Sequence, residues 1–279
     1  MYSLLIEDIV RRALREDVGT GDVTTLATVP PDIQARANIV AREAGVIAGL
    51  PVAEEVFNQV SPDITFTMIR EDGARVSAGE ILARIEGGAR AILTGERVSL
   101  NFLQHLSGIA TRTARFVELV SGTGVRIVDT RKTTPGLRLL EKYAVTVGGG
   151  KNHRMGLDDA VMIKDNHIIA AGGITAAVKR ARSAVPHTMT ITVECENLDH
   201  VKEALESGAD VLLLDNMDNQ TRAAAVKMCK GVALTEASGG ITEETVTEIA
   251  ATGVDVLSVG ALTHSAPALD IALDLTETY

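Results

Sequence analysis

Tryptophan is absent from the 279 residues, aromatic side chains make up 3% of them, and only two cysteines occur, Cys195 and Cys229. Two cysteines are too few for a disulfide framework and fit a reducing compartment, for which the cytosol is the default. A surface that holds nucleic acid needs basic stripes and stacking platforms, whereas this chain has a formal net charge of −10. We therefore expect a cytoplasmic protein with no nucleic-acid partner.

Long apolar runs are also missing, and no segment has the length and apolar character that spanning a bilayer requires, so no membrane partner is expected. Residues 1–19 repeat apolar residues at helical spacing between charges of both signs, which predicts an amphipathic surface helix. A signal peptide would need an uninterrupted apolar core, and a transit peptide would avoid acidic residues such as Glu7 and Asp8. The hydrophobic content of 46% suffices for one large unit or two domains.

From about Arg126 onward, short runs of valine, isoleucine and leucine alternate with helical stretches, a pattern typical of βα units around a parallel sheet or barrel. The runs predicted as strands are residues 125–130, 160–164, 189–194, 210–215, 232–237 and 255–260, with a further one at 143–147. Barrels carry their chemistry on the loops after the strands, so the residues that end these runs are candidate site residues. They are Asp129, Thr130, Arg131, Lys132, Lys164, Glu194, Asp215, Glu236 with Ser238, and Gly260.

Strands also end in polar residues simply because the chain is reaching water. Here, however, the residues separate into strong cations early, carboxylates in the middle and glycine-rich turns late. Arg131 and Lys132 follow a strand directly; an arginine suits a planar carboxylate, and a lysine suits a phosphate. The alternative is a solvated basic loop.

A run of three glycines, residues 148–150, lets the backbone approach a ligand closely before Lys151, His153 and Arg154. Flexible linkers look similar, but this run lies within a compact βα region, which favours a binding loop. Lys164 then ends an apolar run, a position that solubility alone does not explain.

Glu194 and Asp215 each close a mostly apolar strand, so both carboxylates should meet at one barrel face. They could hold ribose hydroxyls and Mg²⁺, or act as a general acid and base pair; the alternative is that they cap the following helices. The late loops with Ser238, Gly239 and Gly240, and with Gly260 and Ala261, are typical of the phosphate site that barrels form after their last strands.

The first hundred residues show a different pattern. Residues 71–87 resemble the hammerhead of lipoyl and biotinyl domains, but no lysine follows to carry such a cofactor, so the segment indicates architecture only. Residues 268–275 alternate apolar and polar or small side chains, which predicts a half-buried strand that returns to the N-terminal domain. Between the halves, residues 93–124 predict two helical stretches broken at Ser107 and Gly108.

Taken in order, nine motifs resemble those of the quinolinate phosphoribosyltransferases, over nearly the whole chain. They are EDVGTGDVTT from Glu16, HLSGIAT from His105, DTRKTTPGLR from Asp129, GGGKNHR from Gly148, KDNH from Lys164, VECEN from Val193, LLLDNM from Leu212, EASGGI from Glu236 and VGALTH from Val259. The resemblance implies an α/β protein with an N-terminal open-faced α/β sandwich, hammerhead-like in part, and a C-terminal incomplete TIM-like α/β barrel. The expected limits are residues 1–107 with 266–279 for the sandwich, and residues 108–265 for the barrel.

The resemblance also implies a site. Arg131, His153, Arg154 and Lys164 would bind the two carboxylates of quinolinate, joined by Arg97 from the partner subunit of a homodimer with shared active sites. Thr130 is a further expected substrate-binding residue. Phosphoribosyl pyrophosphate with Mg²⁺ would be bound by Lys132, Glu194 and Asp215, the last two as metal ligands. Its 5′-phosphate would lie on Ser238, Gly239 and Gly240 and on Gly260 with Ala261. The catalytic residues would be Lys132, Lys164, Glu194 and Asp215.

The expected reaction joins quinolinate to phosphoribosyl pyrophosphate and gives nicotinate mononucleotide, pyrophosphate and carbon dioxide, a step in NAD biosynthesis. One alternative is a related phosphoribosyltransferase that acts on another pyridine or pyrimidine carboxylate. Another is a barrel that binds a phosphorylated metabolite without turnover. The sequence leaves open the order of substrate binding, the group that protonates the ring carbon, and any assembly beyond a dimer.

Overall fold

The computed structural model describes residues 3–279 and divides the chain into two compact units. The first unit comprises Met1–Ala114, Thr133–Gly149 and Thr263–Tyr279, and the second comprises Arg115–Lys132 and Gly150–Leu262. In the described part of the chain, no helix is both long enough and apolar enough to cross a membrane.

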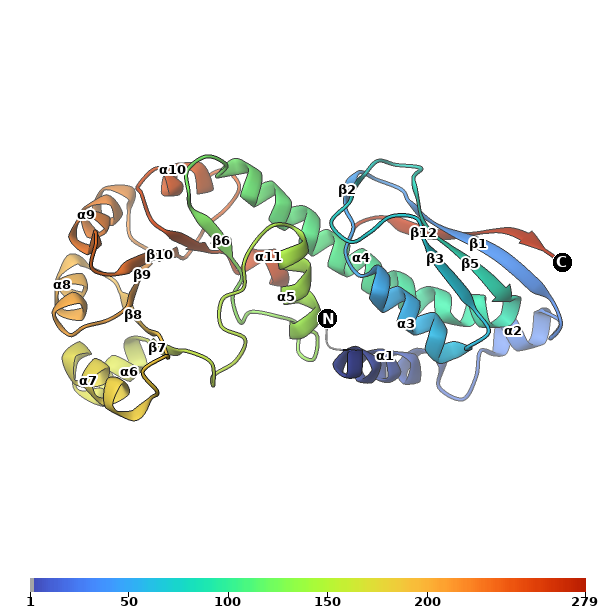
Figure 1. The fold of residues 1–279 in the computed structure, drawn as a ribbon, viewed down its shortest axis with the longest axis horizontal. Coiled ribbons are helices and arrows are strands. Elements are labelled where there is room, and N and C mark those ends of the chain that lie inside the picture. Colours follow the sequence, from blue (N-terminus) through green and yellow to red (C-terminus); the bar gives the residue numbers. More distant parts are fainter. Residues whose placement is uncertain (1–2) are drawn as a thin grey trace. The chain divides into compact units, whose positions relative to one another are not determined.

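The first unit is built on a four-stranded antiparallel sheet in the order β12-β1-β5-β3 (Figure 1). Its strands are β1 (Gln34–Ala41), β3 (Thr65–Met68), β5 (Ile81–Gly88) and β12 (Ile271–Thr278), and β2 (Gly45–Val46) pairs separately with β4 (Arg75–Val76). Its helices are α1 (Ser3–Val18), α2 (Val23–Thr28), α3 (Leu50–Val60), α5 (Arg138–Val147) and most of α4 (Ala89–Leu119). The predicted amphipathic helix at the N-terminus and the predicted returning strand, β12, are confirmed.

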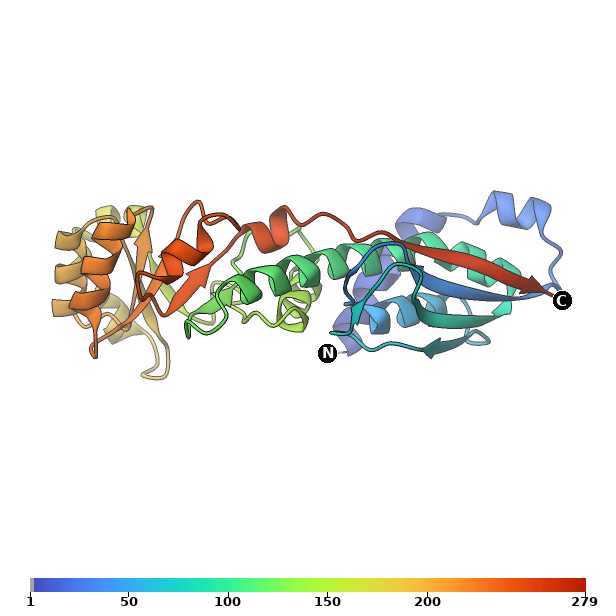
Figure 2. The ribbon, with the colours of Figure 1, turned by 90° about the horizontal axis from the view of Figure 1, so that it is seen from above.

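One face of this sheet is covered and the other is open. The covered face packs against α3 and α4 around fully buried side chains such as Ile39, Phe57 and Leu103. The open face carries exposed ion pairs between neighbouring strands, as in Arg42 with Asp274, where guanidinium nitrogen and carboxylate oxygen are 2.6 Å apart (Figure 2 shows the strands from above). Side chains alternate between the faces of a strand, so this distribution confirms the open-faced sandwich.

The predicted break between two helices at Ser107 and Gly108 is wrong, because α4 runs without interruption from Ala89 to Leu119. The Ser107 hydroxyl does not cap a helix; it accepts a hydrogen bond from the backbone N–H of Ala48, 3.0 Å away. Gly108 allows close packing, since a Cβ there would lie 2.0 Å from the carbonyl oxygen of Pro267. The glycine therefore serves contact between backbones and does not end the helix.

Gly108→Ala is expected to lower the free energy of unfolding by about 1–3 kcal/mol, because the new methyl group meets a backbone oxygen that cannot move aside easily. This loss should outweigh the helix preference of alanine, roughly 1 kcal/mol. Urea denaturation measures the difference. Gly88→Ala is the matched control, since a Cβ at Gly88 would meet nothing within 4 Å. A Gly108→Ala protein as stable as the wild type would contradict the packing role.

The predicted strand at residues 143–147 is also wrong, because this segment belongs to helix α5. Leu140, Ala144 and Val145 are fully buried at helical spacing. Beside them the phenol of Tyr143 donates a hydrogen bond to Asp72, 2.7 Å away. Tertiary packing of this face outweighs the β preference of Val145 and Val147.

The second unit is a curved sheet of six parallel strands in the order β6-β11-β10-β9-β8-β7, with helices along its outer side (Figure 1). The strands are β6 (Arg126–Val128), β7 (Val161–Ile163), β8 (Ile191–Cys195), β9 (Val211–Asp215), β10 (Leu234–Ser238) and β11 (Val256–Ser258). The helices are α6 (Asp165–Ala171), α7 (Ile174–Ala184), α8 (Leu198–Glu206), α9 (Asn219–Cys229), α10 (Val246–Ala250) and the first half of α11 (Ala261–His264), whose last two residues lie in the first unit. The six other predicted strands are thereby confirmed.

The sheet does not close into a full barrel. Its edge strands are β6 and β7, and beyond β6 the chain adds a single parallel bridge between Val128 and Lys151. The incomplete barrel is therefore confirmed. The compact units differ from the expected limits, since Thr133–Gly149 lies with the first unit, and the limits 1–107 with 266–279 and 108–265 stay a prediction about domains.

Candidate active site

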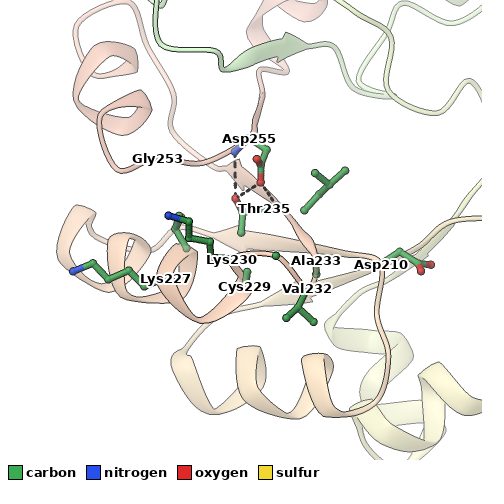
Figure 3. A pocket seen from close by; sticks show the side chains of 12 residues that line it. Asp210, Lys227, Cys229, Lys230, Val232, Ala233, Thr235, Gly253 and Asp255 are labelled. Carbon is green, nitrogen blue, oxygen red and sulfur yellow. Dashed lines mark hydrogen bonds between the residues drawn. The ribbon is translucent and has the colours of Figure 1, made fainter.

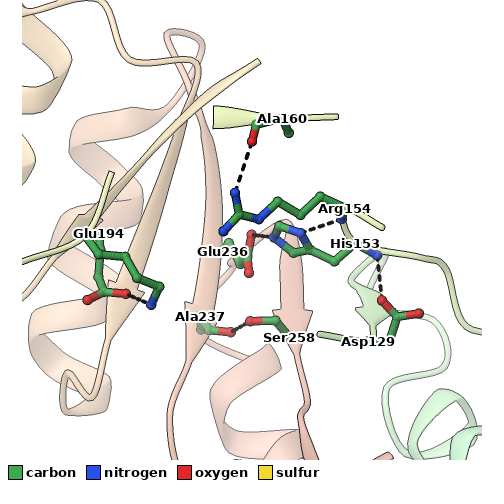
Figure 4. Close-up of polar contacts among 9 residues, drawn as sticks. Asp129, His153, Arg154, Ala160, Glu194, Glu236, Ala237 and Ser258 are labelled. Atoms are coloured by element: carbon green, nitrogen blue, oxygen red, sulfur yellow. Dashed lines mark hydrogen bonds and ion pairs between the residues drawn. The ribbon is translucent and has the colours of Figure 1, made fainter. Parts of the chain in front are cut away.

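The candidate site lies where the barrel strands end, because parallel strands in register bring their carboxyl ends to one edge. Asp215 at the end of β9 is paired with Ser238 at the end of β10, and Ser258 at the end of β11 is paired with Val128. Figure 4 shows side chains from several of these ends directed toward one another. The predicted residues of the second unit that follow these strands therefore lie at one face of the sheet.

Three predicted cations line one cavity of about 740 Å³ at this face, namely Arg131, Arg154 and Lys164. The rest of the lining is mostly apolar and includes Met162 and Ile163 of β7, together with His167 and a fourth cation, Arg180. Burial and the nearby positive charge of Arg131 lower the pKa of Arg154 from its usual range, against an opposing effect of Asp159. Two guanidinium groups close enough to repel favour an anion with more than one negative group between them.

His153 is held at both ring nitrogens. Its Nδ1 accepts a hydrogen bond from the backbone N–H of Arg154 at 2.7 Å, and its Nε2 lies 3.3 Å from a carboxylate oxygen of Glu236 (Figure 4). Its own backbone N–H donates to the buried Asp129, 2.9 Å away. Because Nδ1 acts as an acceptor, the ring proton is on Nε2, which donates a hydrogen bond to the Glu236 carboxylate. These contacts orient the loop that carries Arg154.

Glu236 is a site residue to which the sequence assigned no role beyond its place at a strand end. Its side chain is 5% exposed, and one carboxylate oxygen, Oε1, has no hydrogen-bond partner among the described residues. The signal was present, because Glu236 of β10 and Glu194 of β8 lie at the same level of the sheet, both paired with Leu213 of β9.

Lys164 and Glu194 form an ion pair with 2.5 Å between Nζ and Oε2. Lys164 follows β7 and Glu194 lies near the end of β8, so the neighbouring strands place them side by side. On the next strand, Asp215 accepts a hydrogen bond from the side chain of Asn216 at 2.8 Å. The predicted carboxylates therefore lie at the same face, each with one oxygen engaged by the protein.

Within the described residues, no group of three or more histidine, cysteine, aspartate or glutamate side chains is arranged to hold a metal ion. A site made by the protein alone is therefore not supported. Glu194 and Asp215 fit the other way in which Mg²⁺ is bound, by one or two carboxylates together with substrate phosphates and water.

The glycine-rich loops follow β10 and β11. Gly239 and Gly240 have φ of 92° and 60°, in the left-handed region that glycine enters without strain.

Thr130 shapes the turn after β6, because its hydroxyl accepts a hydrogen bond from the backbone N–H of Lys132 at 3.0 Å. Arg97 is an exposed residue of α4 in the first unit, so its meeting with the barrel residues stays a prediction.

A second cavity, of about 650 Å³, lies at the opposite, amino ends of β10 and β11 (Figure 3). Thr235 and Asp255 lie in its wall, and the Asp255 carboxylate accepts hydrogen bonds from both the backbone N–H and the hydroxyl of Thr235 at 2.8 Å. None of the predicted site residues lines this cavity. At this end of the strands the polar contacts hold the sheet together.

An unclosed parallel barrel with cations and carboxylates gathered at its strand ends belongs to the class of α/β-barrel enzymes that act on anionic substrates. Two family models match the chain: "Quinolinate phosphoribosyl transferase, N-terminal domain" over residues 22–107 and "Quinolinate phosphoribosyl transferase, C-terminal domain" over residues 109–274. The chain therefore belongs to the quinolinate phosphoribosyl transferase family.

Individual relatives are similar to the chain over nearly their whole length. The chain is 44% identical to a "Probable nicotinate-nucleotide pyrophosphorylase [carboxylating]" of Bacillus subtilis, covering 99% of this chain and 95% of the relative. It is 46% identical to the nicotinate-nucleotide pyrophosphorylase of Mycobacterium leprae, covering 96% of each. A solved structure of the nicotinate-nucleotide pyrophosphorylase from Francisella tularensis superposes with a TM-score of 0.95 at 40% identity, covering 99% of this chain and 98% of that one. The predicted family, fold class and phosphoribosyltransferase activity in NAD biosynthesis are thereby confirmed.

Proposed function

We propose that the strand ends of the barrel transfer a phosphoribosyl group from phosphoribosyl pyrophosphate to the ring nitrogen of quinolinate and then release carbon dioxide. The observation that carries this assignment is the cavity lined by Arg131, Arg154 and Lys164, in which burial and the nearby charge of Arg131 lower the pKa of Arg154, so that a bound anion would stabilise its charged form. Its cations suit the two carboxylates of quinolinate. Thr130 and His153 support this side of the site, Thr130 through the turn before Lys132 and His153 through the backbone of Arg154.

In this proposal, the other substrate lies across the ends of β8 to β11. Lys132 offers a point charge to its phosphates, and Glu194 and Asp215 face its ribose and Mg²⁺. The 5′-phosphate lies on the glycine loops, formed by Ser238, Gly239 and Gly240 and by Gly260 with Ala261. When bound, Mg²⁺ would offset the charge that develops on the departing pyrophosphate.

The residues need to position the substrates and balance charge, and no protein nucleophile is required. The bond between the anomeric carbon and pyrophosphate breaks with positive charge on the sugar, which the carboxylates stabilise while the ring nitrogen forms its bond. The positive pyridinium ring then accepts the electron pair as the adjacent carboxylate leaves as carbon dioxide. The ring carbon that lost the carboxylate then takes up a proton. Lys132, Lys164, Glu194 and Asp215 are the residues proposed to act in these steps.

We also propose a homodimer in which Arg97 of each subunit completes the quinolinate site of the other. Two features support this arrangement: Arg97 is exposed on α4, and the barrel sheet ends at β6 and β7 without closing on itself. A cytoplasmic location stays a prediction.

The assay that tests the activity supplies quinolinate, phosphoribosyl pyrophosphate and Mg²⁺. Carbon dioxide and nicotinate mononucleotide are expected in equal amounts. Nicotinate, which has a single carboxylate, replaces quinolinate in a parallel reaction and should give little product, because it lacks one of the two carboxylates that the proposed site binds. Equal turnover of nicotinate would favour a related transferase, and binding of both ligands without any product would favour a non-catalytic barrel.

A further inference from the structure

Asn216, directly after β9, has an unusual backbone conformation. Its φ of 49° is the one positive value at a non-glycine residue within the described residues 3–279. Asparagine enters this left-handed region more readily than most residues, but the conformation still needs support from its surroundings. Such a residue beside a proposed ligand of Mg²⁺ calls for an explanation from its contacts.

Asn216 contacts both strand ends that the proposed function assigns to phosphoribosyl pyrophosphate. Its side-chain Nδ2 donates a hydrogen bond to Oδ2 of Asp215 at 2.8 Å. Its backbone N–H donates to the carbonyl oxygen of Ser238, 3.1 Å away, at the start of the first glycine loop. The conformation of this residue therefore connects a carboxylate to a phosphate loop on the neighbouring strand.

The contact with the glycine loop extends to Gly239. A Cβ at Gly239 would lie 2.1 Å from Oδ1 of Asn216, so the amide occupies the place of a side chain there. At Gly240, by contrast, a Cβ would meet nothing within 4 Å, and only its φ of 60° favours glycine. Asn216 and Gly239 therefore fit one another as a pair.

The loop that follows β9 and begins with Asn216 is also held at its other end. The buried guanidinium of Arg222 donates hydrogen bonds to the carbonyl oxygen of Met217 and to the side chain of Asn219. Arg222 therefore holds the part of the loop that follows Asn216.

We propose that Asn216 is a positioning residue for phosphoribosyl pyrophosphate, which orients the Asp215 carboxylate and holds it at a fixed separation from the Ser238–Gly240 loop. The inference rests on the proposed function, because it requires that Asp215 and the loop bind the two ends of the same substrate. Asn216 acts through these groups and need not touch the reacting atoms.

Asn216→Gly tests the proposal, since glycine allows the left-handed backbone while removing the side chain that donates to Asp215. The KM for phosphoribosyl pyrophosphate is expected to rise about tenfold or more, the effect of losing a hydrogen bond to a charged group, while the KM for quinolinate changes little. Gln220→Ala, an exposed change a few residues along the chain, is the control and should leave both values unchanged. A rise in both KM values, or in neither, would overturn the positioning role.

Gly239→Ala gives a second, independent test. Alone it should raise the KM for phosphoribosyl pyrophosphate strongly, because the methyl group displaces the amide of Asn216. In an Asn216→Gly background the same change should have a smaller effect, since only the backbone strain at residue 239 remains. Equal effects in both backgrounds would overturn the pairing. A wild-type protein that makes no nicotinate mononucleotide would instead refute the proposed function, so the two failures are distinct.

Discussion

Arg154→Ala is expected to weaken quinolinate binding about 100- to 10,000-fold. The change removes two parallel charge-assisted hydrogen bonds to a carboxylate, each worth about 1.5–3 kcal/mol. The binding of phosphoribosyl pyrophosphate should change far less, since its proposed contacts lie at β8 to β11. The pKa of Arg154 is lowered by burial and by Arg131, so its charge is poorly solvated without a ligand, and a dianion gains by contacting it.

Calorimetric titration of each ligand separates the two effects. Arg182→Ala removes one positive charge at the opposite end of the strands, where Arg182 pairs with Asp210 at 2.7 Å, and serves as the control for net charge. It should leave both affinities close to those of the wild type. Equal losses for both ligands in Arg154→Ala would count against a specific contact with quinolinate.

Mixing Arg97→Ala chains with Lys132→Ala chains is expected to restore activity, although each variant alone is inactive. In a hybrid dimer with shared sites, one site lacks both residues and the other has neither substitution. Random exchange of subunits makes half of the dimers hybrid, so about a quarter of all sites should become native.

The rate of product formation after mixing measures this recovery, and subunit exchange is verified separately with differently tagged chains. A mixture of Arg154→Ala with Lys132→Ala chains is the matched control, because both residues belong to the same barrel and no hybrid site is native. Proven exchange without recovery in the Arg97 mixture would exclude the shared site.

The barrel could be predicted from the sequence because its strands are short, buried runs of branched aliphatic residues with polar ends, as in Val211–Asp215. Two local predictions failed for the same physical reason. At Gly108 and at residues 143–147, the local preference pointed away from helix, but close packing against Pro267 and burial of Leu140 and Ala144 determined the structure. Such long-range contacts leave no mark on nearby residues.

In the candidate site, residue types and strand ends predicted which side chains gather in the barrel. They did not predict which side chains pair. The contacts of His153 with Glu236 and of Asn216 with Gly239 join loops that are far apart in sequence, and their geometry depends on the register of the sheet. The proposed role of Arg97 depends on a second chain, which no single sequence pattern describes.

The ion pair between Lys164 and Glu194 has a consequence for how the two substrates influence one another. In the free site each charge neutralises the other across 2.5 Å. In the proposed function, a quinolinate carboxylate that attracts Lys164 would leave the negative charge of Glu194 uncompensated and able to attract the cation that accompanies the diphosphate. By thermodynamic linkage, each substrate would then raise the affinity for the other by the same factor, so the ion pair would make the binding of the two substrates cooperative.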